Sequence, residues 1–392
     1  MSVRRCLAVR LVTSLTCGLA GGLAGGWDVR SATYIRSFRG KQSVISVDKA
    51  MTNQQGGSQQ PAGIRDVARK AGVSVASVSF ALNGQPGVAK DTRRRILAAA
   101  AELGYRANPQ AQALRRGRTT TYGLVIRNFS NPFFLEVLTG AERAADEAGA
   151  TLLLLDSHYS IERERMHVRE MAAQRLAGLA IAPVGDGESV RLWQELRPGT
   201  PVVALNASME GFARVSRVYP DNAVGVALAM RRLAELGHAS AAFLSAPRGM
   251  AADTDRLRYF RRHARELGVR PHVMRSPLTI ADVRKAARTL LTRRDAPTAI
   301  ITNSDYTALG IYKTARDLSL RIGPDVSVIG HDDLPTSELL DPPLATIRID
   351  GQEMGRALMT RLLDWDPPTD YVAPVELVER ASLASTGLSP FT

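Results

Sequence analysis

The sequence predicts an α/β protein that combines a small all-helical head with a two-lobed body of doubly wound parallel sheets. Three short segments between residues 63 and 107 have the apolar spacing of amphipathic helices. From Thr121 onward, apolar strand-like runs alternate with helical stretches, a pattern that favours parallel sheets covered by helices. Residues 121–392 are too many for one sheet of ordinary size, so two similar lobes with a cleft between them are expected.

The first two helices of the head are separated by a tight Gly-Val-Ser turn. The first is predicted from an apolar stripe at spacings of three and four residues, formed by Ile64, Val67, Ala68 and Ala71. Gly72 stops this helix, and the hydroxyl of Ser74 can cap the next one. In the second helix an inward face is expected for Val75, Val78 and Leu82, and an outward face for Ala76, Ser77, Ser79 and Phe80.

A third amphipathic helix is expected from about Asp91 to Leu103, and Gly104 ends it. Its buried residues are expected to be Ile96, Ala100 and Leu103, and its exposed residues Arg93, Arg94 and Arg95. A pair of helices joined by a tight turn can place the second helix in a DNA major groove. The same spacing also fits a generic three-helix bundle whose charges form a solvated surface.

The formal charge of +13 is confined to the front of the chain. Residues 1–50 hold 8 Lys/Arg and 2 Asp/Glu, residues 51–121 hold 11 and 3, and the remainder holds 32 and 33. A basic front on a nearly neutral body fits a head that meets phosphates and a body that does not.

The first 62 residues are expected to be a leader without structure. Arg4 and Arg5 precede a weakly apolar run, which resembles a secretory signal. Export would separate the head from DNA, so the true start is expected at Met51. Both cysteines, Cys6 and Cys17, lie in this leader, which leaves no cysteine for a disulfide or a metal site in the rest of the sequence.

Longer motifs support a specific family resemblance. Two of them are Ile64-Arg-Asp-Val-Ala-Arg-Lys-Ala-Gly-Val-Ser74 and Val75-Ala-Ser-Val-Ser-Phe-Ala-Leu-Asn83, and two more surround Asn108 and Leu114. With these motifs, residues 63–121 resemble the head of the LacI/GalR family of bacterial transcription regulators. The resemblance implies a helix-turn-helix DNA-binding head over 63–107, a hinge helix and linker over 108–120, and an effector-binding domain over 121–392.

The resemblance also implies how double-stranded operator DNA is bound. Residues from Val75 to Phe80 would read base edges, and Ser77, Ser79, Asn83 and Tyr105 would contact phosphates. Leu114, in a hinge helix over 109–116, would wedge into the minor groove, with Arg115 beside it. The full expected DNA-binding set is Ser74, Val75, Ala76, Ser77, Ser79, Phe80, Asn83, Tyr105, Asn108, Ala111, Leu114 and Arg115.

Two positions in the head depart from the family pattern. Phe80 stands where many members carry an arginine that can bond guanine, and an aromatic side chain there can contact a thymine methyl group instead. Ala89 stands where the family usually has a serine that caps the third helix, and Asp91 in the first turn can compensate through the helix dipole.

The strands expected in the body are Tyr122–Ile126, Thr151–Leu155, Gly178–Ala182, Val202–Leu205, Ser240–Leu244, Ala299–Thr302 and Val326–Gly330. The resemblance covers this whole region and implies a periplasmic-binding-protein-like effector domain. One lobe would comprise about 121–218 and 351–378, and the other 219–350 and 379–392, so the chain would cross between lobes near residues 218, 350 and 378.

The resemblance places a small-molecule effector, a sugar or sugar derivative, in the cleft. Its expected contacts are Phe133, Phe134, Asn206, Arg256, Ser304 and Asp332. Three alternatives stay open: Phe134 as a core residue, Asp332 as a turn residue, and Arg258 in place of Arg256. Tyr259, Ser304 and His331 replace residues that are usual in the family, which weakens the transfer of any particular ligand.

The expected function is a cytoplasmic, nucleoid-associated transcriptional repressor that acts as a homodimer, with a tetramer left open and without a membrane partner. No phosphate loop, zinc-ligand spacing or nucleophile elbow is found in the sequence, so neither catalysis nor a cofactor nor a metal site is expected. The alternative is an exported periplasmic-type solute-binding protein, which would explain two lobes and the leader but not residues 64–118.

Overall fold

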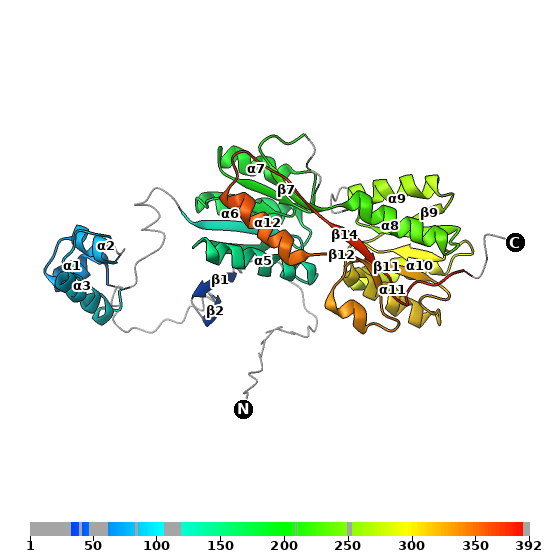
Figure 1. Ribbon diagram of the computed structural model, residues 1–392, viewed down its shortest axis with the longest axis horizontal. Coiled ribbons are helices and arrows are strands. Elements are labelled where there is room, and N and C mark those ends of the chain that lie inside the picture. Colours follow the sequence, from blue (N-terminus) through cyan, green and yellow to red (C-terminus); the bar gives the residue numbers. More distant parts are fainter. Residues whose placement is uncertain are drawn as a thin grey trace, which may run out of the picture. The chain divides into compact units, whose positions relative to one another are not determined.

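The computed structural model describes residues 33–38, 41–46, 62–82, 85–105, 119–207, 209, 211–248 and 253–386 (Figure 1). The head contains α1 (Ile64–Ala71), α2 (Val75–Leu82) and α3 (Lys90–Glu102). Val67, Val78 and Ile96, one from each helix, are fully buried at its centre. Gly72 ends α1 with a left-handed φ of 63°, and the Oγ of Ser74 accepts a 3.1 Å hydrogen bond from the backbone N of Ser77.

The structure corrects two expectations about the faces of the head helices. Val75 was expected to be buried but is 39% exposed, and Ala81 is buried instead. The buried face of α2 therefore centres on Val78 and Ala81, three residues apart, and the first residue of the helix lies beyond it. Arg93 was expected to be exposed but is half-buried, because its guanidinium donates to the carbonyl oxygens of Ala81 (3.2 Å) and Gln85 (2.5 Å).

The leader also differs from the expectation of no structure. Strand β1 (Thr33–Phe38) pairs antiparallel with β2 (Lys41–Ser46), with Thr33 opposite Ser46. The two segments contain threonine, tyrosine, isoleucine, phenylalanine and valine, which are common strand residues. The expected start at Met51 stays a prediction.

Lobe 1 is built on a parallel sheet with the strand order β13-β7-β6-β5-β3-β4. Its strands are β3 (Thr121–Ile126), β4 (Thr151–Asp156), β5 (Leu179–Ile181), β6 (Val202–Leu205), β7 (Ser216–Pro220) and β13 (Tyr371–Ala373). Helices α5 (Phe133–Glu147) and α12 (Gly351–Leu363) cover one face, and α6 (Ile161–Ala173) and α7 (Glu188–Leu196) cover the other.

Lobe 2 repeats this plan with the strand order β14-β12-β11-β10-β8-β9, in which only β14 is antiparallel to its neighbour. Its strands are β8 (Ser240–Ser245), β9 (Arg270–Arg275), β10 (Ala299–Ile301), β11 (Ser327–Asp332), β12 (Ala345–Ile349) and β14 (Val375–Val378). Helices α8 (Asn222–Glu235) and α9 (Thr254–Glu266) pack on one face, and α10 (Ile280–Leu291) and α11 (Asp305–Asp317) on the other.

The chain crosses between the lobes three times. The first crossing lies between β7 and α8 and the second between β12 and α12, so the orange α12 lies among the cyan and green elements of lobe 1 (Figure 1). The third was expected near residue 378, but β14 already pairs with β12 of lobe 2, which puts the crossing at Pro374. Proline lacks the N–H that a continuing strand ladder needs, so it favours a change of sheet at this point.

Helices α5 and α12 approach closely through two glycines. A Cβ on Gly355 would lie 1.9 Å from the carbonyl oxygen of Val137, and one on Gly140 would lie 1.8 Å from that of Gln352. Both obstacles are backbone atoms, which cannot move aside as a flexible side chain can. The contact holds the returning segment onto lobe 1. Among the residues that the structure describes, no helix has the length and apolarity needed to cross a membrane.

Substitution of Gly355 by alanine tests this contact. Replacing a glycine within a helix by alanine stabilises the helix by about 0.5–1 kcal/mol, whereas overpacking a tight contact costs about 1–3 kcal/mol. We therefore expect Gly355→Ala to lower the free energy of unfolding of the body in urea by about 1–2 kcal/mol. The matched control is Gly63→Ala, whose Cβ would meet only Asp66 Oδ2 at 3.6 Å. A body as stable as the wild type would disprove the close approach.

Candidate functional site

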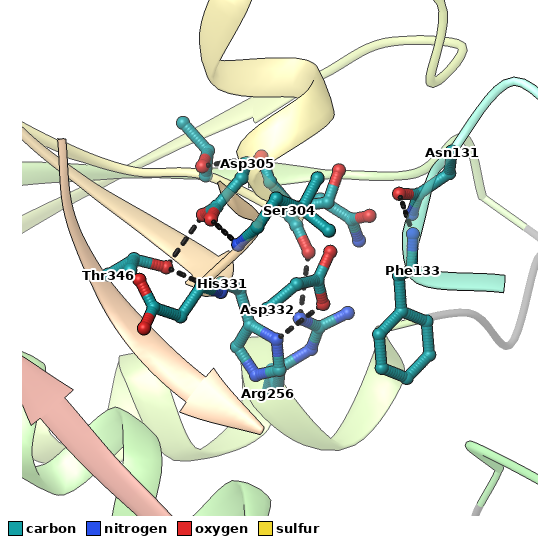
Figure 2. Close-up of polar contacts among 12 residues, drawn as sticks. Asn131, Phe133, Arg256, Ser304, Asp305, His331, Asp332 and Thr346 are labelled. Atoms are coloured by element: carbon teal, nitrogen blue, oxygen red, sulfur yellow. Dashed lines mark hydrogen bonds and ion pairs between the residues drawn. The ribbon is translucent and has the colours of Figure 1, made fainter. Parts of the chain in front are cut away.

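Buried polar side chains gather at the carboxyl ends of the lobe 2 strands, where ligands bind in open α/β sheets. We call Asn131, Arg256, Asn303, His331 and Asp332 the inter-lobe cluster. Figure 2 labels all of them except Asn303. Asn131 comes from lobe 1 and the other four from lobe 2. All five are buried, and each carries a group that can donate or accept a hydrogen bond.

Asp332 is the focus of this cluster. It is the last residue of β11, is only 7% exposed and has a left-handed φ of 121°, which is a strained conformation for a residue other than glycine. Its Oδ1 lies 3.3 Å from Nδ1 of His331, whereas its Oδ2 has no hydrogen-bond partner among the described residues. Asp332 is the last residue of strand β11, and not a simple turn residue as in the alternative that the sequence left open.

Burial dominates the electrostatics of the cluster. It raises the pKa of Asp332 well above the usual aspartate range; the charge of Asp305 adds to this, while Arg256 and the side chain of Asn131 oppose it. Burial likewise holds the pKa of His331 well below its usual value, with a further contribution from Arg256. The imidazole is therefore neutral at physiological pH.

Arg256 supplies the buried cation of the cluster. It lies in the first turn of α9, is 4% exposed and donates from Nη1 to the carbonyl oxygen of Asn303 at 2.8 Å. Burial lowers its pKa, while Asp253 and Asp332 raise it. The side chain of Arg258, the alternative from the sequence, is 57% exposed and pairs with Asp255 at 3.0 Å. Of the two arginines, only Arg256 reaches the cluster.

Asp305 supports the cluster from behind, and sequence reasoning assigned it no role. Its Oδ1 accepts from the Thr346 hydroxyl at 2.6 Å. Its Oδ2 accepts from the Ser337 hydroxyl at 2.6 Å and from the backbone N of Leu334 at 2.9 Å. One carboxylate thereby ties α11 to β12 and to the segment that follows Asp332. In the sequence, the motif Ser304-Asp305 was the signal that could have pointed to Asp305.

Ser304 stands at the start of the same helix. Its Oγ accepts from the backbone N of Thr307 at 3.2 Å, and its own backbone N donates to the Thr307 hydroxyl at 3.1 Å. The hydroxyl thus caps α11. Its role as an effector contact stays a prediction.

Lobe 1 contributes two phenylalanines. Phe133 and Phe134 are each 3% exposed, and their rings make an edge-to-face contact with centroids 5.6 Å apart. Both belong to the core of lobe 1, in agreement with the core alternative for Phe134. The backbone N of Phe133 donates to Asn131 Oδ1 at 3.2 Å, and Figure 2 shows its ring on the side of the cluster that lobe 1 provides.

Asn206 is half-buried with a left-handed φ of 51°, and its carbonyl oxygen accepts from Nη2 of Arg127 at 2.8 Å. Arg127 was missed by the sequence analysis although it is only 3% exposed. Its Nε donates to the carbonyl oxygen of Pro183 at 3.0 Å. Tyr159 was missed as well; burial raises its pKa to about 12, and the nearby charge of Arg127 opposes the shift. Within the described residues no group of acidic, histidine or cysteine side chains has the arrangement of a metal site.

The expected DNA-binding residues are described only in part. Ser74, Val75, Ala76 and Phe80 are exposed on the head, and Ser77, Ser79 and Tyr105 are half-buried. The ring of Tyr105 packs against the head core. The expected hinge helix lies outside the described residues. So do the remaining five DNA-binding residues, which are Asn83, Asn108, Ala111, Leu114 and Arg115.

Known protein families and relatives match both the head and the body of this architecture. Residues 63–108 match the model of bacterial regulatory proteins of the lacI family, and residues 230–383 match a periplasmic binding protein-like domain. The ribose operon repressor of Halalkalibacterium halodurans is 31% identical over 327 residues, which cover 81% of this chain and 96% of the relative. The chain belongs to the lacI family. The PurR repressor of Vibrio vulnificus is 29% identical over 77% of this chain and 91% of its own.

Solved structures agree with this membership. The lac repressor dimer bound to operator and an anti-inducer has a TM-score of 0.74 at 27% identity, covering 83% of this chain and all of its own. The regulator CelR in complex with cellobiose has a TM-score of 0.61 at 27% identity, covering 82% of this chain and 99% of its own. This lacI-family member is a DNA-binding transcriptional regulator with a helix-turn-helix head and a two-lobed α/β effector domain.

The electrostatics of Asp332 predict an unusual pH dependence of stability. Its pKa is higher in the folded than in the unfolded chain, so its stabilising contribution is complete below the unfolded pKa and is lost as pH rises through the folded one. At pH 7, where an aspartate of the unfolded chain is ionised, the raised pKa of Asp332 therefore lowers the stability of the fold. We expect Asp332→Asn to raise the Tm at pH 7 by about 2–4 °C for each kcal/mol by which it increases the free energy of unfolding. At pH 4 the rise in Tm should be smaller.

Calorimetry on the full chain at both pH values measures this effect. The exposed Asp186→Asn provides the matched control, with no change in Tm expected at either pH. A Tm of Asp332→Asn that falls further below that of the wild type at pH 7 than at pH 4 would contradict a raised pKa of Asp332 in the folded chain.

Proposed function

We propose that this regulator is a repressor whose homodimer binds a two-fold operator and whose operator affinity is set by a small molecule in the inter-lobe cluster. The observation that carries the proposal is Asp332: a buried, strained aspartate with one oxygen unpartnered among the described residues, beside the buried Arg256. Such a group is expensive to keep unless a ligand uses it. The head supplies the DNA-binding activity that a repressor needs.

The donor set favours a polyol ligand. A guanidinium donates hydrogen bonds to hydroxyl oxygens, and a carboxylate accepts them from hydroxyl groups. Arg256 and Asp332 offer both groups, Asn131 adds an amide, and Phe133 provides an apolar surface for the carbon face of a ring. A sugar or sugar derivative is therefore the proposed class. The relatives include a ribose operon repressor and a PurR repressor, so the ligand screen described below covers both sugars and nucleobases.

A homodimer is proposed because a two-fold protein reads two half-sites that are related by the same symmetry. The related lac repressor binds its operator as a dimer, which supports the proposal. Leu114 and Arg115 are proposed to act in the minor groove between the half-sites. Activity on DNA places the protein in the cytoplasm in this proposal. No feature of the described chain calls for a tetramer, and none is part of the proposal.

Salt dependence tests the DNA-binding part. Duplexes selected by the full-length protein from a random-sequence library are the probe, and affinity is measured by fluorescence anisotropy. A protein that contacts about 6–10 phosphates loses about 10³–10⁵ in affinity between about 50 and 200 mM salt, and we expect a loss in this range. An unselected duplex serves as the control, with weaker binding. Failure to enrich any duplex would refute the operator proposal.

A ligand screen tests the effector part. Sugars and nucleobases are added to the purified protein, and the Tm is recorded. A ligand at 100 times its Kd stabilises by about 2.7 kcal/mol, so we expect a rise of several degrees for the correct class. The shift should vanish in Asp332→Ala and persist in Arg258→Ala, a charged neighbour outside the cluster. A shift that survives Asp332→Ala would refute the binding site.

A further inference from the structure

Three of the four residues on the solvent-facing arc of α2 are apolar. Val75 is 39% exposed, Phe80 is 44% exposed and Ala76 is exposed as well. On a helix with 3.6 residues per turn, these three residues and Ser79 fall within an arc of about 140°. The buried Val78 and Ala81 lie on the opposite side. We call Val75, Ala76 and Phe80 the apolar reading face.

Polar readout from this helix is scarce. The sequence of α2, Val-Ala-Ser-Val-Ser-Phe-Ala-Leu, holds no charged side chain and no amide. It therefore lacks the groups that bond guanine or adenine bidentately, which are arginine, lysine, asparagine and glutamine. The Ser77 hydroxyl lies 2.9 Å from the Ser74 hydroxyl, which itself caps the helix, so these two groups already serve the head.

The second helix of a helix-turn-helix unit enters the major groove with its N-terminal residues toward the base edges. The apolar group that the bases present there is the C5-methyl of thymine. Resting on the proposed operator binding, we propose that the apolar reading face selects its half-site through thymine methyl groups, with Phe80 as the principal specificity-determining residue. Phe80 is the largest side chain of this face and buries the most apolar surface against a methyl group.

Affinity and specificity then come from different parts of the head. Exposed basic residues on the neighbouring helices, including Arg65 on α1 and Arg95 on α3, supply the charge for sequence-independent phosphate attraction. The apolar reading face contributes sequence preference. Burying one methyl group changes affinity by about fourfold, so one methyl in each of two half-sites changes it by about fifteenfold.

Replacement of thymine by uracil isolates the methyl group, because uracil retains the pairing and the O4 acceptor. Duplexes selected by the full-length protein from a random library are prepared with thymidine or with deoxyuridine throughout. We expect the wild type to bind the deoxyuridine form about tenfold or more weakly. Phe80→Ala should lose most of this ratio, Phe80→Leu should retain part of it, and Phe80→Arg should enrich guanine in a new selection.

Phe129→Ala is the matched control, because Phe129 is a similarly exposed phenylalanine (40%) in the body. It should keep the wild-type ratio. Equal binding of both duplexes by the wild type would overturn the inference and leave operator binding intact. An undiminished ratio in Phe80→Ala would overturn the role of Phe80. Failure to select any duplex would instead refute the proposed function itself.

Discussion

The buried carboxylate of Asp332 is the constraint around which the body is organised. It is held at the end of β11 in a strained backbone conformation, with Arg256 and His331 from its own lobe and Asn131 from the other. An ionised group in such surroundings is costly, and its pKa rises for that reason. The contacts around it have to be rigid if the group is to remain in place.

That rigidity comes from features distant in the sequence. Asp305 fastens the segment after Asp332 to β12 and α11, so the strained residue cannot relax by moving its loop. The three crossings join the lobes, and the close packing of α5 on α12 anchors one of the returning segments. The two lobes can then close around a small molecule. The three connecting segments restrict how the lobes move relative to each other.

The sequence predicted the class of the fold, the helices of the head and seven of the strands near their observed bounds, because apolar periodicity and turn residues are local signals. Among the strands that it missed are β7 and β9, whose residues include arginine, proline and histidine. Strand β9 is an edge strand and β7 lies next to one, so neither shows a continuous apolar run. Val75 and Arg93 were placed on the wrong faces because periodicity gives spacing but not the side on which the other helices pack.

The site was predictable only where a motif marked it. Arg256 and Asp332 followed from the family resemblance, and the structure brings both into one buried cluster. Arg127 and Asp305 were missed because their partners lie 56–79 and 29–41 residues away, respectively, so no local pattern reveals them. The third crossing also depended on which sheet accepts β14, a choice that its four residues do not encode.

Control of operator affinity by a ligand at Arg256 and Asp332 is a coupling between two sites, and it can be measured as one. Operator affinity is determined for the wild type and for Arg256→Ala, each with and without the ligand that most stabilises the wild type. We expect the ligand to change the affinity of the wild type by about 5–150-fold and to leave that of Arg256→Ala unchanged. The same ligand-dependent change in both proteins would contradict control through this cluster.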